Sequence, residues 1–217
     1  MHVSAIILRD LRRAWTGGGL LWPVAFFLLV ATLFPFAVGP DAALIGRIGG
    51  GVIWAAALLA ALLPVERLIA PDVEAGVIDQ YAVRGVPLAL VAFAKTIAHW
   101  LGFAPPLMLA AVIAAGLFDL PAATLLRVEA GLLVGTPGLA ALAVATSALV
   151  TGLRGGGGVA GALAGLVMLP LAIPLLIFGA GSLDTGVGAL KLLGAVSLLL
   201  TAGAPWIAAA AIRAGMD

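Results

Sequence analysis

The sequence predicts an all-α integral membrane protein with six transmembrane helices. Hydrophobic residues make up 64% of the 217 residues and charged residues only 10%. A soluble domain has about 25% charged residues. The apolar residues form solid runs, whereas the strands of a membrane β-barrel alternate apolar and polar residues. Lipid offers no partner to a free backbone N–H or C=O, so these runs are expected to be helical.

The first element, residues 2–15, is expected to be an amphipathic helix lying on the membrane surface. Four apolar residues share one helical face: Val3, Ile7, Leu11 and Trp15. Three arginines lie largely opposite this face, where anionic lipid headgroups would bind them. The apolar run that follows is too long for the core of a signal peptide, and no persuasive cleavage site comes after it. We therefore expect this helix to remain in the protein, with membrane lipid as its partner.

Six apolar runs have the length of about 20 residues that a transmembrane helix needs. They are expected to cross the membrane as residues 20–38, 48–65, 88–118, 122–150, 159–178 and 187–212. Internal prolines are expected to kink the third, fourth and fifth of these helices, because proline lacks the N–H that closes a helical turn. The whole chain, residues 1–217, is then a single membrane domain.

The positions of lysine and arginine predict the orientation, because cytosolic segments are enriched in both. With the N-terminus in the cytosol, the cytosolic segments hold Arg9, Arg12, Arg13, Arg67, Arg84, Arg154 and Arg213. The outer loops are expected at 39–47, 119–121 and 179–186, and they hold only Arg47. Both termini and the loops 66–87 and 151–158 are therefore expected in the cytosol.

The longest polar connection, residues 66–87, lies between the second and third spans. Its part from 66 to 84 contains six charged residues, of which four are acidic. Anionic lipid repels such a segment, so we expect it to bind another protein rather than the bilayer surface. Pro71, followed by Asp72 and Glu74, predicts a short helix within it. A solvated connection without a binding role is the alternative.

The sequence lacks the motifs of common nucleotide, hydrolase and thiolate sites. Neither of the two lysines follows a glycine, so there is no P-loop, and no His-Glu-x-x-His or Gly-x-Ser-x-Gly occurs. There are no cysteines, which excludes disulfides and thiolate metal sites. The net charge of +1 gives no reason to expect a nucleic-acid partner. We expect a chain that is not itself an enzyme and holds no catalytic residue, metal or firmly bound cofactor.

Five stretches in order along the chain carry a resemblance to a known family. They are Phe-Phe-Leu-Leu-Val-Ala-Thr-Leu-Phe-Pro-Phe-Ala-Val-Gly-Pro (26–40), Glu-Arg-Leu (66–68), Ala-Lys-Thr-Ile-Ala-His-Trp (94–100), Leu-Leu-Val-Gly-Thr-Pro (132–137) and Leu-Pro-Leu-Ala-Ile-Pro-Leu-Leu-Ile-Phe-Gly-Ala-Gly (169–181). With these stretches at matching spacing, nearly the whole chain resembles the haem exporter protein B family of bacterial cytochrome c maturation.

The resemblance implies the membrane permease subunit of an ABC-type complex in the bacterial inner membrane. Such a complex delivers haem to the periplasm for the biogenesis of c-type cytochromes, with haem as a possible transported substrate. The implied partners are a separate ATP-binding subunit, a haem-handling membrane protein, a small single-span subunit and a periplasmic haem chaperone. The alternative is an assembly scaffold that couples the partner's ATP hydrolysis to release of the haem-loaded chaperone, without moving haem itself.

The resemblance also places a coupling helix, which contacts the ATP-binding subunit, in the loop 66–87. The residues expected to make this contact are Glu66, Arg67, Asp72, Glu74, Gly76, Asp79 and Gln80. One departure affects the expected contact. After Glu-Arg-Leu the family usually continues with an aromatic residue, a basic residue and two acids, whereas this chain has Ile69-Ala70-Pro71-Asp72.

Two ionisable residues, Lys95 and His99, lie one turn apart on one face of the third span. We expect the Lys95 ammonium to reach toward the cytosolic interface and the His99 imidazole to form a hydrogen bond between helices. The alternative is a haem site, in which His99 ligates the iron and Lys95 meets a haem propionate, since imidazole is a common axial ligand. Met108 or Met168 is a further alternative as iron ligand.

Overall fold

A computed structural model describes residues 3–16, 19, 21–152 and 159–216, and this part of the chain contains helices and no strand. Six of the helices are long and apolar enough to cross a membrane: α2 (Leu21–Val38), α3 (Ala42–Leu62), α6 (Leu88–Leu117), α7 (Ala122–Gly152), α8 (Val159–Thr185) and α9 (Val187–Met216). The predicted all-α class with six spans is confirmed. Arg154 and most of the expected loop 151–158 lie outside the described residues, as does residue 2.

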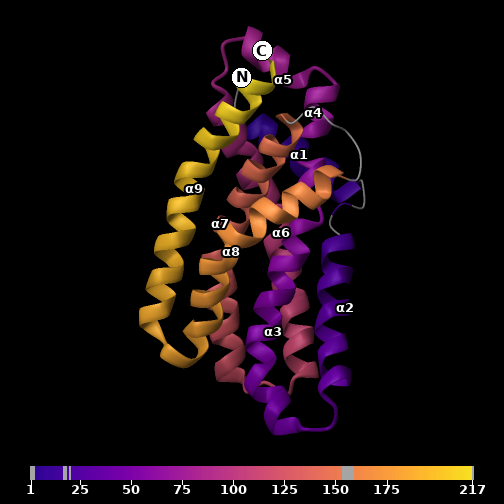
Figure 1. The fold of residues 1–217 in the computed structure, drawn as a ribbon, viewed down its shortest axis with the longest axis vertical. Coiled ribbons are helices and arrows are strands. Elements are labelled where there is room, and N and C mark those ends of the chain that lie inside the picture. Colours follow the sequence, from indigo (N-terminus) through magenta and orange to yellow (C-terminus); the bar gives the residue numbers. More distant parts are fainter. Residues whose placement is uncertain (1–2, 17–18, 20, 153–158, 217) are drawn as a thin grey trace.

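Four shorter elements complete the described part of the chain. They are α1 (Val3–Thr16), the 3-10 turn η1 (Val65–Arg67), α4 (Ala70–Glu74) and α5 (Val77–Val83). Figure 1 shows α4, α5 and both termini at one end of the bundle, while the short connections α2–α3, α6–α7 and α8–α9 lie at the other. Residues 66–87, called the polar segment below, therefore lie at the same end of the bundle as both termini.

Helix α7 is the most buried of the six spans, and α2 is the least buried. Helix α7 packs against α3, α6, α8 and α9. Its contact with α9 is close at Gly138, whose N–H donates to Ser197 Oγ at 2.9 Å. A Cβ at Gly138 would lie 2.8 Å from Ser197 Cα, so only glycine fits there. Small residues at such crossings let two membrane helices approach closely.

The indole of Trp54 in α3 is 1% exposed and lies against glycines of α7 and α8. A Cβ at Gly135 or Gly179 would come within 2.6 or 2.5 Å of the ring. Helix α8 continues past Gly179 to Thr185, so the expectation of an outer loop at 179–186 is wrong. The expected span ends at residue 178, but the helix continues through Gly179, which makes room for the indole.

Helix α3 begins at Ala42, earlier than the expected start of the span at residue 48. The Asp41 side chain accepts a hydrogen bond from the Leu44 N–H at 2.9 Å and so caps the first turn. The exposed Arg47 lies within the helix, which is why an apolar run starts later than the helix does. The start of the apolar run therefore predicts where the span begins, whereas the Asp41 cap fixes where the helix begins.

The internal prolines lie inside long helices, with Pro105 and Pro106 in α6, Pro137 in α7, and Pro170 and Pro174 in α8. Figure 1 shows that α8 changes direction along its length. Pro170 and Pro174 have no N–H, so α8 lacks two helical hydrogen bonds. The helix bends more easily where these bonds are missing.

Candidate functional site

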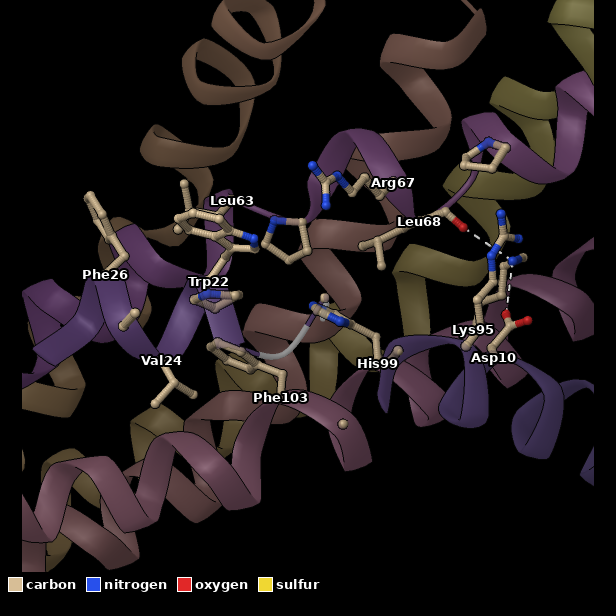
Figure 2. Close-up of a pocket in the computed structure, with 18 of the residues that line it drawn as sticks. Asp10, Trp22, Val24, Phe26, Leu63, Arg67, Leu68, Lys95, His99 and Phe103 are labelled. Carbon is tan, nitrogen blue, oxygen red and sulfur yellow. Dashed lines mark hydrogen bonds and ion pairs between the residues drawn. The ribbon is translucent and has the colours of Figure 1, made fainter. Parts of the chain in front are cut away.

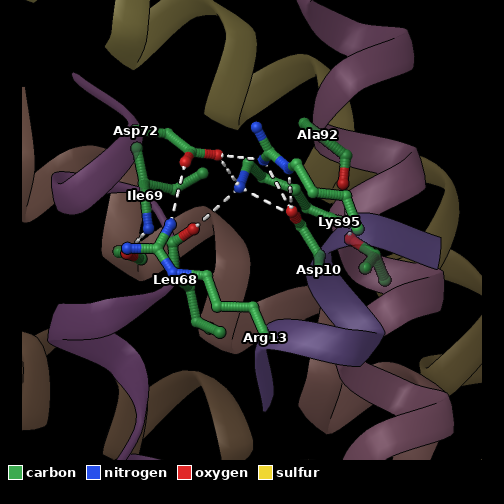
Figure 3. Close-up of polar contacts among 10 residues, drawn as sticks. Asp10, Arg13, Leu68, Ile69, Asp72, Ala92 and Lys95 are labelled. Carbon is green, nitrogen blue, oxygen red and sulfur yellow. Dashed lines mark hydrogen bonds and ion pairs between the residues drawn. The ribbon is translucent and has the colours of Figure 1, made fainter. Parts of the chain in front are cut away.

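Five charged residues from three separate segments form one ion cluster at the end of the bundle that holds the termini. They are Arg9, Asp10 and Arg13 of α1, Asp72 of α4 and Lys95 of α6. Figure 3 shows the side chains of Asp10, Arg13, Asp72 and Lys95 converging between the three helices. Because these residues are far apart in the sequence, the cluster ties α1 and the polar segment to the membrane span α6.

Lys95 lies at the centre of this ion cluster and is only 5% exposed. Its Nζ forms an ion pair with Asp72, and it donates to Asp10 Oδ2 at 2.9 Å and to the Leu68 carbonyl oxygen at 3.2 Å. An ammonium has three N–H donors, and these three oxygens use all of them. The Lys95 ammonium thus reaches toward the end of the bundle that holds the termini, where two carboxylates hold it inside the protein.

Asp72 is the most buried acid of the ion cluster, with 2% of the residue exposed. Its carboxylate accepts hydrogen bonds from Arg9 and from Arg13, the latter at 3.2 Å. Burial alone would raise the pKa of the Asp72 carboxyl, but the charges of Lys95 and Arg9 outweigh it and hold this pKa below its usual value. A partner protein cannot reach this carboxylate while the cluster is intact.

The polar segment contains two short helices instead of the single one expected. Pro71 lies in the first turn of α4, as predicted, and Gly76 separates α4 from α5. Gly76 has a φ of 66°, a left-handed conformation that glycine adopts at no steric cost. Tyr81 of α5 is buried, which anchors the second helix against the bundle.

The departure from the family pattern at residues 69–71 begins with a residue that points inward. Ile69 is fully buried, and it packs with Ile6 of α1 and Leu88 of α6. Its backbone N–H donates to the Ser147 hydroxyl of α7 at 3.1 Å. Ile69 therefore joins the polar segment to the bundle, and it does not belong to the surface that a partner could touch.

Most of the residues expected to contact a partner lie on the surface of the polar segment. The exposed ones are Glu66, Arg67, Glu74, Asp79 and Gln80. Gly76 is half-buried, and Asp72 is buried in the ion cluster. The exposed residues therefore form a surface with three acids, while Asp72 connects this surface to the membrane span.

A cavity of about 810 Å³ lies beside the ion cluster, bordered by α1, α2, the α3–α4 connection and α6. Its apolar part is lined by Trp22 and Phe26 of α2 and by Phe103 of α6. Its polar part contains Asp10, Arg13, Arg67, Lys95 and His99. Figure 2 shows His99 between the aromatic side chains on one side and the Asp10–Lys95 pair on the other. The volume is within the range of about 300–1,000 Å³ that ligand pockets occupy.

His99 is the unsatisfied polar group of this cavity. Its buried Nε2 has no hydrogen-bond partner among the described residues, and its ring stacks on Phe103 with centroids 5.6 Å apart. The expected hydrogen bond between helices is made instead by the neighbouring residue, Trp100, whose Nε1 donates to Thr136 Oγ1 at 3.0 Å. A buried ring nitrogen without a protein partner is available to a ligand.

The described residues offer no group of three or more histidine, cysteine or acidic side chains that could hold a metal ion. Met108 and Met168 pack with the hydrophobic core and do not line the cavity, so the structure does not favour either as an iron ligand there. His99 is the one candidate ligand from the sequence analysis that lines the cavity.

From the sequence, the α1 arginines were expected only at the lipid headgroups, and Asp10 had no expected role. The signal for the ion cluster is a single acid among three arginines in a surface helix, with a lysine inside a span that begins at the same end of the bundle. A buried charge needs a partner of opposite sign. The fold brings the charged residues of α1, α4 and α6 together so that they pair.

Six spanning helices with a polar segment at one end define a multi-pass helical membrane protein. A family model described as "CcmB protein" matches residues 1–215, and the chain belongs to this family. It is 41% identical over 221 residues to "Heme exporter protein B" of Rhodobacter capsulatus and, over the same length, to that of Paracoccus denitrificans. Both alignments cover 99% of this chain and 100% of the relative. The Escherichia coli K12 relative of the same name is 38% identical over 197 residues, 88% of each chain.

Proposed function

We propose that this chain is the membrane permease subunit of a haem exporter that serves c-type cytochrome biogenesis. The observation that supports the proposal is 41% sequence identity, over 99% of this chain, to two proteins named heme exporter protein B. The six spans fit a transport subunit of the inner membrane. The sequence contains no P-loop, so ATP hydrolysis is assigned to a separate subunit.

The experiment that tests this function removes the gene from its own host and measures haem covalently attached to c-type cytochromes. We expect the attached haem to be lost in the deletion strain and restored when the chain is supplied again. The control is an empty vector in the same strain. Normal cytochromes in the deletion strain would contradict the proposal.

The proposed site for the ATP-binding subunit is the exposed surface of η1, α4 and α5. It offers the acids Glu66, Glu74 and Asp79, together with Gln80. Arg67, also expected at this contact, lies at its edge and lines the cavity. Asp72 is given a different role, because its carboxylate is enclosed by the ion cluster. A partner that moves α4 acts, through Asp72 and Lys95, on the membrane span α6.

The proposed site for haem is the cavity between α1, α2 and α6. The His99 Nε2 without a hydrogen-bond partner supports it, because imidazole nitrogen is a common axial ligand of haem iron. Three aromatic residues, Trp22, Phe26 and Phe103, supply apolar surface for the flat ring. Lys95 is placed as a support for the cavity wall rather than as a haem contact, since its three donors are used within the protein.

A second candidate function is a scaffold in which ATP hydrolysis releases a haem-loaded chaperone and no haem crosses this subunit. Two observations favour it. Helix α7 packs closely against its neighbours in the centre of the bundle. The cavity lies at the side of the bundle, next to the least buried span, α2. Purified complex in lipid vesicles separates the two functions. Haem crossing without the chaperone supports transport, and chaperone release without haem crossing supports the scaffold.

A further inference from the structure

The cavity contains more positive than negative charge. Among the described residues that line it, Arg13, Arg67 and Lys95 carry a positive charge, and Asp10 is the one acid. Asp10 is itself engaged by Lys95 and by Arg9, which lies outside the cavity lining. A ligand in this cavity therefore meets an excess of positive charge beside an aromatic surface.

The three cations differ in the donors that they have left for a ligand. Lys95 has none, because Asp10, Asp72 and the Leu68 carbonyl take its three N–H groups. Arg13 has a side chain that is 61% exposed, and its Nη1 donates a hydrogen bond to Asp72 at 3.2 Å. A guanidinium carries five N–H donors, so most donors of Arg13 remain available.

Arg67 is the least engaged of the three cations. It is exposed, and its side chain has no hydrogen bond or ion pair with any residue in the described part of the chain. Figure 2 shows Arg67 between the aromatic side chains and the Asp10–Lys95 pair, on the same cavity as His99. A guanidinium in this setting is suited to a carboxylate, which it binds with two parallel hydrogen bonds.

We propose that Arg13 and Arg67 form an anion site for the carboxylates of an amphiphilic ligand whose flat apolar body lies against Trp22 and Phe103. The inference rests on the proposed function, in which the ligand is haem and the anions are its two propionates. It assigns the anionic end of the ligand to two arginines and excludes Lys95, which the spacing from His99 had suggested.

The test compares ferric haem with haem dimethyl ester, which keeps the iron and the ring but lacks both negative charges. The full chain is titrated with each compound in nanodiscs of neutral lipid, and binding is measured from the haem absorbance. We expect haem to bind at least about tenfold more tightly than the ester, as a charge-assisted hydrogen bond gives such a difference. Arg67→Gln should remove about tenfold of haem affinity and leave ester affinity unchanged.

Arg67→Gln is the decisive variant, because it breaks no contact of the described structure. Arg13→Gln should act in the same direction, although it also removes a bond to Asp72. Arg12→Gln is the matched control, since Arg12 is an exposed arginine of the same helix that does not line the cavity. It should leave the affinity for both compounds unchanged.

The outcomes separate this inference from the haem cavity itself. Equal affinity for haem and ester in the unmodified chain, unchanged in Arg67→Gln, would overturn the anion site and leave the cavity standing. Absence of binding by either compound would overturn both. A lipid phosphate is a second source of the same chemistry. If phosphatidylglycerol nanodiscs weaken haem binding in the unmodified chain and not in Arg67→Gln, the arginines bind the anions of both molecules.

Discussion

The carboxylate of Asp72 and the ammonium of Lys95 form a buried ion pair that joins the polar segment to a membrane span. Asp72 is 2% exposed and Lys95 is 5% exposed, so neither charge is compensated by water. Three further residues of α1, Arg9, Asp10 and Arg13, complete the ion cluster. The short helix α4 is therefore held to α6 through charges as well as through apolar packing.

Removing one partner of this pair should destabilise the protein strongly. Asp72→Asn or Lys95→Met leaves the other charge without its closest partner, which costs about 3–5 kcal/mol at a buried site. The double variant should lose less than the sum of the two single losses. Thermal unfolding of the detergent-purified chain measures all four members of the cycle, and strictly additive losses would contradict the direct pairing.

Acid should weaken the structure through Asp72. Its pKa in the folded protein is held below the ordinary value, because Lys95 and Arg9 outweigh the effect of burial. The stabilisation by this carboxylate is therefore fully present above its unfolded pKa and is lost as the pH falls through the lower, folded pKa. The melting temperature of the unmodified chain should fall on that acid side more steeply than the melting temperature of Asp72→Asn. Parallel curves would show that Asp72 does not carry the effect.

Charge reversal on the exposed acidic surface should weaken recruitment of the ATP-binding subunit. Glu74→Lys places like charges together if the partner surface is basic, which costs several kcal/mol. Co-purification of the two subunits from membranes should then fall while the amount of inserted chain stays the same. Asp119→Lys is the control, because Asp119 is an exposed acid in the α6–α7 connection at the other end of the bundle. Unchanged co-purification for Glu74→Lys would mean that this acid is not part of the contact.

The orientation is tested by reporter fusions, since both termini and the polar segment share one end of the bundle. A fusion after Arg84 should report the cytosol, because arginine and lysine are concentrated on that side. A fusion near Asp41 should report the periplasm. A periplasmic signal at Arg84 would place the polar segment away from any cytosolic ATP-binding subunit, and the coupling proposal would fail.

His99→Ala should remove the haem absorbance of the purified subunit and change its stability little. The imidazole Nε2 has no hydrogen-bond partner among the described residues, so the substitution leaves no partner unsatisfied there. Trp100→Phe is the matched control on the next residue, because it removes the Trp100–Thr136 hydrogen bond. This control should lower the melting temperature and keep the haem absorbance. The opposite pattern in the two variants would assign His99 to structure alone.

The helical fold class and the number of spans could be predicted, because both follow from local composition. A run of about 20 apolar residues has few alternatives in a membrane, whatever lies around it. The end of α8 could not be predicted in this way, because the helix continues past the expected end at residue 178, through Gly179, which contacts Trp54. That role depends on a residue of α3, which no local pattern reveals.

The candidate site was predictable only in part for the same reason. His99 and Lys95 were identified because ionisable residues are rare inside a span. The donors of Lys95 are nevertheless used by Asp10 and Asp72, which lie on two other helices. Arg67 was assigned to a partner contact, and its position on the cavity depends on the fold, which brings residues of η1 and α6 to line the same cavity.

The ion cluster also limits how this sequence can change during evolution. A single substitution at Asp72 or Lys95 leaves a buried charge without its partner, whereas apolar residues at both positions remove the two charges together. Related sequences that lack one of these residues are therefore expected to lack the other. Substitutions at Asp72 in the polar segment and at Lys95 in the membrane span α6 would then occur together.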